Sequence, residues 1–236
     1  MSELYALDVN SSRDFIISDA AIKLVSIERL EASRKFRKES DFLLSMGGEL
    51  LARAIIREKL KIKNDDINFG RTYYGKPFLK GVEGFHFNVS HSGGLVICAI
   101  SNIEIGCDCE FISEENKIDE IRIVYTDNEY KLIRSFKGPE KTLLCHKIWA
   151  LKESYLKCAG IGLSEEPGSL EISFGGESPA VYKNGRRLDY RLKLYGDIKS
   201  YAMAACIKNG AGKAIESLPD KIIFTGRDFL SANILK

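Results

Sequence analysis

The spacing of hydrophobic residues divides the chain into helical and strand-like segments. Residues 29–60 are charged in their first part and carry apolar residues at three-to-four spacing in their second part, which predicts a helix. Similar spacing predicts helices over residues 118–136 and 145–160, and the latter ends at Ala159-Gly160, a typical helix stop. Helices of this kind need a sheet or other helices on which to bury their apolar faces.

The other hydrophobic segments are short or alternate with polar residues, which predicts strands separated by turns. In the first half, the expected strands are residues 85–89, 95–100 and 103–111, with a hairpin turn at Gly93-Gly94. In the second half, they are residues 170–174, 180–183, 190–195 and 201–207, separated by Gly176, Asn184-Gly185 and Gly196-Asp197. Helices and strands in both halves predict an α+β fold.

The two halves of the chain resemble each other weakly. The apolar residues 95–100 follow a glycine-rich turn, and the apolar residues 202–207 follow another turn in the same way. We therefore expect an N-terminal subdomain of residues 1–103, a C-terminal subdomain of residues 104–215 and a C-terminal tail of residues 216–236. Because no low-complexity linker separates the halves, we expect them to pack tightly around a ligand cleft. In the tail, Ile222-Ile223-Phe224 is expected to form either an added strand or a packed arm.

Composition and charge exclude several classes of protein. The 236 residues are 44% hydrophobic, and 35 basic against 33 acidic residues leave a net charge of +2, so no nucleic-acid or membrane-surface binding is expected. Residues 1–20 lack a signal-peptide core, and no segment approaches the roughly 20 apolar residues of a membrane span. The six cysteines lack the dense spacing of a disulfide scaffold. We expect a cytoplasmic monomer whose cysteines are reduced and mostly buried.

Two carboxylates share one face of the expected strand 103–111. The strand period of two places Asp108 and Glu110 on one side and Cys107 and Cys109 on the other. Two such acids repel each other unless a cation lies between them, and oxygen ligands suit a hard cation such as Mg²⁺. The alternative is a solvated outer face. A zinc site on the cysteines would need further ligands, and the chain has only three histidines and no second close cysteine pair.

The expected helix 145–160 carries a third acid that can face this strand. Trp149, Glu153 and Lys157 are spaced i, i+4 and i+8 along one helix face. Glu153 can therefore point inward toward the two strand carboxylates. The alternative is an ordinary surface pair between Glu153 and Lys157, which contributes only a few tenths of a kcal/mol.

Residues 87–94, Phe-Asn-Val-Ser-His-Ser-Gly-Gly, end a strand in small polar groups. Such a turn offers backbone N–H donors to an anion, or else it caps its own backbone. Ser90 and His91 are neighbours on a strand and point to opposite faces, which argues against a Ser-His nucleophile pair. Lys76, between Gly75 and Pro77, is a further cationic turn residue, although most such lysines are simply exposed.

Taken in order, four motifs in the chain resemble those of surfactin-type 4'-phosphopantetheinyl transferases. They are Gly75-Lys76-Pro77, Phe87-Asn88-x-Ser90-His91-Ser92-Gly93, Ile105-Gly106-x-Asp108-x-Glu110 and Trp149-x-x-Lys152-Glu153-Ser154-x-x-Lys157. The resemblance extends from about Arg29 to Ile207 and implies a pseudo-twofold pair of similar α/β subdomains in one chain. It also implies transfer of the 4'-phosphopantetheine arm of coenzyme A to a serine of an apo acyl or peptidyl carrier protein, with release of adenosine 3',5'-bisphosphate.

The same resemblance implies roles for individual residues. Asp108, Glu110 and Glu153 resemble the ligands of a Mg²⁺ ion that holds the pyrophosphate of coenzyme A. Glu153 is also the residue best placed to take the proton from the carrier serine, and Lys157 resembles the lysine near the transferred phosphate. Asp108, Glu153 and Lys157 are thus the expected catalytic residues.

Coenzyme A contacts are carried over in the same way. Lys76, Ser90 and His91 resemble its nucleotide and phosphate contacts, and Lys157 its contact near the transferred phosphate. Arg29 and Ser45 occupy positions where the family has a lysine and a threonine. Ala32 stands where the family has a second lysine, so Arg34 or Lys35 is expected to supply that charge. Glu129 resembles a further acidic residue near the site.

Two other functions are compatible with these residues. One is a different magnesium-dependent transferase or hydrolase that acts on a nucleotide pyrophosphate. The other is a degenerate carrier-binding module, against which the set Asp108, Glu110, Glu153 and Lys157 argues. The apolar segment 111–125 is expected to be either part of the core or a docking surface for the carrier.

Overall fold

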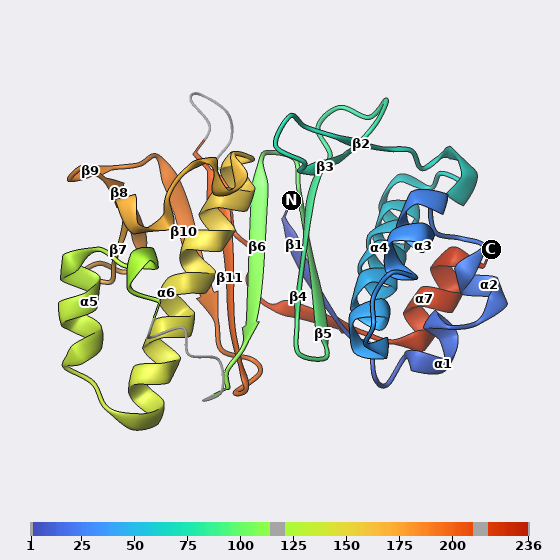
Figure 1. The fold of residues 1–236 in the computed structure, drawn as a ribbon. Coiled ribbons are helices and arrows are strands. Elements are labelled where there is room, and N and C mark those ends of the chain that lie inside the picture. The colour runs from blue at the N-terminus through green and yellow to red at the C-terminus, as the bar shows by residue number, and fades with distance from the viewer. Residues whose placement is uncertain (1, 114–120, 210–216, 236) are drawn as a thin grey trace.

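Two β-sheets pack against each other at the centre of the molecule, with apolar side chains between them, and helices cover the outer face of each (Figure 1). The computed structural model describes residues 2–113, 121–209 and 217–235. The first sheet has the strand order β12-β1-β5-β4 and the second has the order β10-β11-β6. Helices therefore enclose both sheets in a layered arrangement of helix, sheet, sheet and helix. The predicted α+β class is confirmed.

The elements follow one another in two series. The first series is β1 (Glu3–Asp8), α1 (Arg13–Ile16), α2 (Asp19–Ile22), α3 (Ile27–Ser33), α4 (Glu39–Leu60), η1 (Asn64–Asp66), β2 (Phe69–Arg71), β3 (Pro77–Leu79), β4 (His86–Ser92) and β5 (Leu95–Ser101). The second is β6 (Ile105–Phe111), η3 (Arg122–Val124), α5 (Asp127–Arg134), α6 (Gly138–Ala159), η4 (Gly162–Ser164), η5 (Pro167–Ser169), β7 (Leu170–Ser173), β8 (Ala180–Lys183), β9 (Arg186–Arg187), β10 (Tyr190–Tyr195), β11 (Tyr201–Lys208), β12 (Ile222–Thr225) and α7 (Arg227–Ile234). All strands expected from the alternation are present, with bounds shifted by a few residues.

Apolar side chains fill three spaces between these layers. One cluster lies between the first sheet and its helices, and a second lies between the second sheet and α5 and α6. The third lies between the two sheets and joins Leu4 and Ile97 of the first to Cys107 and Met203 of the second. All six cysteines are free and buried, as the sequence predicts. The two halves of the chain are therefore held together by a common core.

The edge strands β4 and β6 belong to different sheets, and side chains of β4 link them. Alternate residues of β4 accept hydrogen bonds from alternate backbone N–H groups of β6. The Asn88 side chain accepts from the N–H of Cys107 at 2.8 Å, that of Ser90 from Cys109 at 3.5 Å, and that of Ser92 from Phe111 at 3.0 Å. The strand period of two makes such a side-chain seam possible. It fixes the register of β4 against β6 and places Ser90 beside Asp108.

The helix expected over residues 29–60 is in fact two helices, α3 and α4. The Ser26 side chain accepts the N–H of Arg29 and caps α3 at its start. The guanidinium of Arg29 then bonds to Glu49 and Ser45 of α4, which requires the chain to fold back between the two helices. The prediction of one continuous helix was wrong because this contact lies outside the local pattern.

The other two helices also begin at residues different from those expected. Helix α5 starts at Asp127, since Thr126 and Glu129 form a reciprocal capping box there. Residues 118–120 of the expected helix lie outside the described residues. Helix α6 starts at Gly138, well before the expected Cys145, and ends at Ala159 as predicted, with Gly160 in the left-handed conformation at φ 68°.

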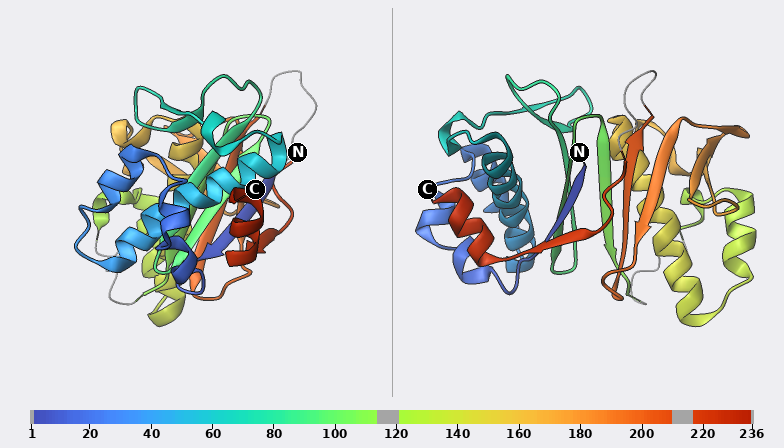
Figure 2. Two further views of the ribbon diagram at one scale, coloured as in Figure 1. Left: turned by 90° about the vertical axis from the view of Figure 1, so that its right-hand side faces the viewer. Right: turned by 180° about the vertical axis from the view of Figure 1, so that it is seen from behind.

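The C-terminal tail returns to the first sheet (Figure 2). Strand β12 pairs in parallel with β1, so the alternative of an added strand is confirmed. Helix α7, which the sequence pattern did not predict, packs against α4, and Arg57 donates a hydrogen bond to the carbonyl of Ile234. None of the described helices combines the length and apolarity that crossing a bilayer requires.

Helix α6 approaches β6 closely at Gly106. A Cβ atom there would lie 2.2 Å from the carbonyl oxygen of Ser154 and 2.3 Å from the backbone nitrogen of Cys158. Backbone atoms of a packed helix cannot move aside as a flexible side chain can. Glycine at this position therefore sets the distance between the face of β6 and the face of α6.

Replacing Gly106 by alanine is expected to lower the free energy of unfolding by about 3 kcal/mol, because α6 must shift away from β6. Urea denaturation followed by circular dichroism measures this change. Gly196→Ala is the matched control, because a Cβ at Gly196 meets no atom of the described residues within 4 Å. Equal stability of the two variants would show that α6 is not held as closely as described.

Candidate active site

The predicted carboxylates of β6 face α6. Gly106, on the same strand face as Asp108 and Glu110, lies against the backbone of α6, while Cys107 and Cys109 are buried in the core between the sheets. Asp108 is 2% exposed and Glu110 is half-buried. The expectation that the cysteines form the back of an acidic face is therefore confirmed.

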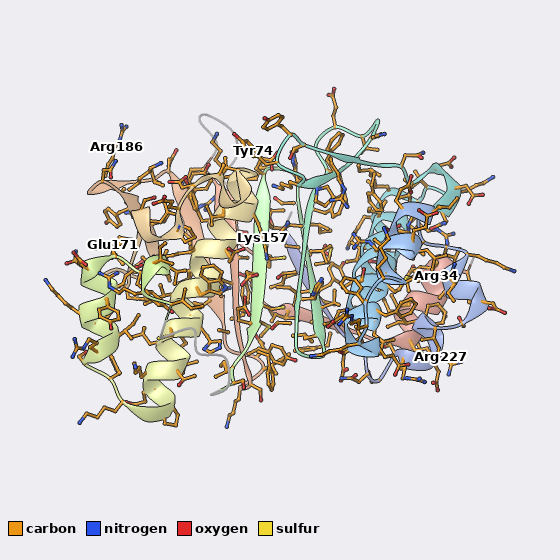
Figure 3. All side chains as sticks on the ribbon, in the orientation of Figure 1. Arg34, Tyr74, Lys157, Glu171, Arg186 and Arg227 are labelled. Atoms are coloured by element: carbon orange, nitrogen blue, oxygen red, sulfur yellow. The ribbon has the colours of Figure 1, made fainter. Side chains whose placement is uncertain are left out.

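Lys157 of α6 reaches Asp108 across this contact, and Figure 3 labels it beside β6. Its Nζ lies 2.5 Å from Oδ1 of Asp108, and the Ser90 hydroxyl donates to the same oxygen at 2.8 Å. Lys157 also donates to Ser90 Oγ at 3.0 Å. Burial alone would lower the pKa of Lys157, but the charge of Asp108 and the hydrogen bond to it raise that pKa above its ordinary value. Three residues from β4, β6 and α6 thus meet at one carboxylate.

Glu110 is held by two donors from the same elements. The indole N–H of Trp149 donates to its Oε1 at 3.0 Å, and the Ser92 hydroxyl donates to its Oε2 at 3.4 Å. Burial, reinforced by the charge on Asp108, raises the pKa of Glu110 to about 7. Trp149 and Lys157 therefore engage the two β6 carboxylates from opposite ends of one helix face, as their spacing predicts.

Glu153 lies on α6 between Trp149 and Lys157. Its Oε2 is 3.9 Å from Nζ of Lys157, and its side chain is 17% exposed. Burial raises its pKa; the charge of Lys157 opposes this shift and the charge of Asp108 adds to it. The carboxylate is thus partly accessible beside the strand acids and disposed to accept a proton.

Residues of the first half line a cleft of about 940 Å³. Arg29, Ser45 and His91 belong to its walls, together with residues of α3, α4, β2 and β3. Burial, with the positive charges of Lys157 and then Arg29, lowers the pKa of His91. His91 thus lines the cleft, while Ser90, one residue earlier, binds the carboxylate of Asp108.

Lys76 and the cation expected in place of Ala32 are not where the sequence predicts them. Lys76 does not line the cleft but donates to Glu104 at 2.7 Å, to the carbonyl of Ile105 and to the carbonyl of Cys158. Besides Arg29, the cleft wall carries four cations that were not expected from the sequence, and neither Arg34 nor Lys35 lines it. They are Lys23, Arg53, Arg71 and Lys80. Only the fold brings them there, since they lie on separate segments of the chain.

The carboxylates suit a hard cation, although they do not converge on one point. The part of the chain that the structure describes contains no group of three or more His, Cys, Asp or Glu side chains arranged around a common point as metal ligands. Oδ2 of Asp108 is nevertheless buried and has no hydrogen-bond partner among the described residues. A buried anionic oxygen without a donor is unfavourable unless a cation is available to it. The donor set thus fits Mg²⁺ in chemistry and burial.

Comparison with known proteins assigns the chain to a family. Residues 13–103 match the family model "4'-phosphopantetheinyl transferase, N-terminal", and residues 104–206 match the model "4'-phosphopantetheinyl transferase superfamily". A 4'-phosphopantetheinyl transferase of Aneurinibacillus migulanus is 33% identical over 188 residues, which cover 79% of this chain and 78% of the relative. The chain belongs to the 4'-phosphopantetheinyl transferase superfamily. It is therefore an enzyme of the family that the motifs predict.

Relatives from Bacillus subtilis agree with this assignment. The 4'-phosphopantetheinyl transferase ffp is 33% identical over 80% of this chain and 84% of its own length. The 4'-phosphopantetheinyl transferase Sfp of strain 168 is 29% identical over 78% of this chain and 83% of its own length. Both matches span the two halves of the transferase, so the family assignment covers the carboxylates as well as the cleft.

The transferase also contains a buried ion pair whose role the sequence did not reveal. Lys152 is fully buried, and its ammonium donates to Glu129 at 2.6 Å, to the carbonyl of Val124 and to the carbonyl of Pro167. Glu129 accepts in addition from the N–H of Ile172. The motif resemblance placed Glu129 near the site, and the structure shows that it anchors α5 and its flanking segments to α6.

Glu129→Gln is expected to lower the free energy of unfolding by about 3 kcal/mol, since it leaves the ammonium of Lys152 buried without a counter-charge. Thermal and urea unfolding measure the loss. Adding Lys152→Met to this variant removes the buried charge and is expected to restore part of the stability. If Glu129→Gln alone is as stable as the parent chain, the structural role of the ion pair is contradicted.

The described part of the segment 111–125 contains both buried and exposed apolar residues. Val124 and Tyr125 are buried, whereas Ile121 is 50% and Ile123 is 76% exposed. Residues 114–120 lie outside the described residues. Val124 and Tyr125 therefore belong to the core, and a docking surface for the carrier stays a prediction for the exposed Ile121 and Ile123.

Proposed function

We propose that this transferase moves the 4'-phosphopantetheine arm of coenzyme A to a serine of an apo acyl or peptidyl carrier protein. The products are the holo carrier protein and adenosine 3',5'-bisphosphate. The observation that carries the proposal is the meeting of Asp108 and Glu110 of β6 with Glu153 and Lys157 of α6, at the junction of two halves that both match this family.

The cleft of the first half is the proposed seat of the nucleotide part of coenzyme A. Arg29 contributes a cation to its wall and Ser45 beside it a hydroxyl group, and His91, next in the chain to the Ser90 that binds Asp108, also lines it. Phosphate groups bind well to guanidinium and ammonium groups and to hydroxyl donors. A molecule of coenzyme A lying in this cleft would direct its pyrophosphate past His91 toward Asp108.

The carboxylates are the proposed holders of Mg²⁺. Asp108, Glu110 and Glu153 would hold the ion, which would neutralise pyrophosphate charge and polarise the reacting phosphorus. Lys157 would then stabilise charge on the leaving bisphosphate, as a positive side chain beside developing negative charge does. Glu153, whose pKa is raised, is the proposed base that accepts the proton of the carrier serine.

The test is incubation of the full chain with coenzyme A, Mg²⁺ and a panel of apo acyl and peptidyl carrier proteins. We expect each true acceptor to gain one phosphopantetheine group, seen as a change in the intact mass of the carrier. Cleavage of coenzyme A without carrier modification would instead favour the alternative of a nucleotide pyrophosphate hydrolase. If neither a carrier adduct nor cleavage of coenzyme A is observed, the proposal is overturned.

A further inference from the structure

The ammonium of Lys157 lies close to two of the three carboxylates that are proposed to hold Mg²⁺. Its Nζ lies 2.5 Å from Oδ1 of Asp108 and 3.9 Å from Oε2 of Glu153, the two acids that belong to different elements. At 2.5 Å the ammonium forms a charge-assisted hydrogen bond with Asp108, whereas at 3.9 Å it interacts with Glu153 through charge alone. Lys157 therefore serves both acids as their counter-ion.

The ion pair is found where the carboxylates do not converge as a ligand set. Among the described residues, no three acidic, His or Cys side chains are arranged around a common point. With Lys157 between them, Asp108 and Glu153 are separated by a cation that is already bound. A divalent ion approaching the free Oδ2 of Asp108 would meet the like charge of Lys157 on the neighbouring Oδ1, which disfavours its binding.

Lys157 has the freedom to leave Asp108. Its side chain is 28% exposed, whereas that of Asp108 is 3% exposed, so the ammonium lies at the accessible side of the pair. A lysine is a point charge on a flexible stem with three rotatable donors, and it can exchange one anionic partner for another. Ser90 donates to the same oxygen of Asp108 at 2.8 Å and keeps it partly satisfied when the ammonium moves.

We infer that Lys157 is an internal counter-ion that competes with Mg²⁺ for Asp108 and that coenzyme A relieves this competition by offering its pyrophosphate to the lysine. The inference rests on the proposed function for the identity of the phosphate ligand. Its first half, the competition with Mg²⁺, concerns the chain alone. By linkage, any increase that coenzyme A causes in Mg²⁺ affinity must equal the increase that Mg²⁺ causes in coenzyme A affinity.

The experiment is a titration of the full chain with MgCl₂, without and with coenzyme A, by isothermal calorimetry at about pH 8, above the ordinary carboxyl range. Fluorescence of Trp149 gives a second readout, because it is the only tryptophan and its indole binds Glu110. Lys157→Met removes the charge, Lys157→Arg retains it, and Lys147→Met removes a lysine charge elsewhere on α6.

In the absence of coenzyme A, Lys157→Met is expected to bind Mg²⁺ about tenfold more tightly than the parent chain, which corresponds to about 1.4 kcal/mol of relieved competition. Lys157→Arg and Lys147→Met are expected to bind Mg²⁺ as the parent does. Adding coenzyme A is expected to tighten Mg²⁺ binding to the parent and to have a smaller effect on Lys157→Met. The direction of the change in Mg²⁺ affinity is informative. If Lys157 only supported the fold, its removal would weaken Mg²⁺ binding, whereas removal of a competing charge strengthens it.

Equal or weaker Mg²⁺ binding by a folded Lys157→Met variant would overturn the inference. Lys157→Gln, which keeps an N–H donor for Asp108 without the charge, replaces Lys157→Met if that variant does not fold, and the same outcomes apply to it. If coenzyme A does not bind to the parent chain at all, the proposed function fails. The titrations without coenzyme A still decide the competition between Lys157 and Mg²⁺.

Discussion

Glu153→Gln is expected to retain coenzyme A binding and to lose transfer by about 10²-fold to 10⁴-fold, the contribution of a positioned base. Glutamine has the size of glutamate but cannot accept a proton from the carrier serine. Burial and the charge of Asp108 raise the pKa of Glu153, with Lys157 opposing them, which moves the carboxylate toward the range suited to proton transfer near neutral pH. Coenzyme A affinity by calorimetry and initial rates with one apo carrier measure the two effects separately.

The matched control for this variant is Glu140→Gln, in the first turn of the same helix. It removes one negative charge from α6 at an exposed position and should leave both coenzyme A affinity and transfer rate unchanged. A Glu153→Gln variant that turns over at the parent rate would remove Glu153 from the mechanism. One that no longer binds coenzyme A would assign the residue to binding instead.

Asp108→Asn is expected to lower transfer by about 10³-fold, because it removes the charge on which the Mg²⁺ site depends. Asp108 is 2% exposed, and the same oxygen binds Lys157 and Ser90, so one substitution disturbs groups from α6 and β4 together. This variant should also lose Mg²⁺ binding in the calorimetric titration. Transfer rates at increasing Mg²⁺ concentration show whether added metal restores activity.

Asp127→Asn provides the control for charge alone, since Asp127 is exposed at the start of α5. Far-ultraviolet circular dichroism and thermal unfolding must show that Asp108→Asn remains folded. Full activity of the folded Asp108→Asn variant at ordinary Mg²⁺ concentration would contradict the metal-holding role of β6.

Much of the fold follows from local patterns in the sequence. Period-two alternation found β6 and the faces of its acids, and the Gly93-Gly94 turn marked the hairpin of β4 and β5. The break between α3 and α4 was missed, because it depends on Arg29 bonding to α4 rather than on any turn residue. Helix α7 was missed for a similar reason, since it is stabilised by packing on α4.

The site was predicted to a similar extent. Helical spacing placed Trp149, Glu153 and Lys157 on one face, and the structure shows that Trp149 and Lys157 bind Glu110 and Asp108. The seam of Asn88, Ser90 and Ser92 was not predicted, because it depends on the register between two sheets. Alternation along β4 was its only local signal. The engagement of Lys76 with Glu104 and α6 was equally invisible to a local motif.

This chain is expected to form holo carrier protein from coenzyme A. The most direct measurement follows both products of one reaction that contains the full chain, coenzyme A, Mg²⁺ and an apo carrier. We expect one phosphopantetheine group on the carrier serine, by intact mass and peptide mapping, for each adenosine 3',5'-bisphosphate released, and no adduct on a carrier whose serine is replaced by alanine. Absence of the adduct from every acyl and peptidyl carrier tested, with the chain folded and Mg²⁺ present, would contradict the proposed transfer.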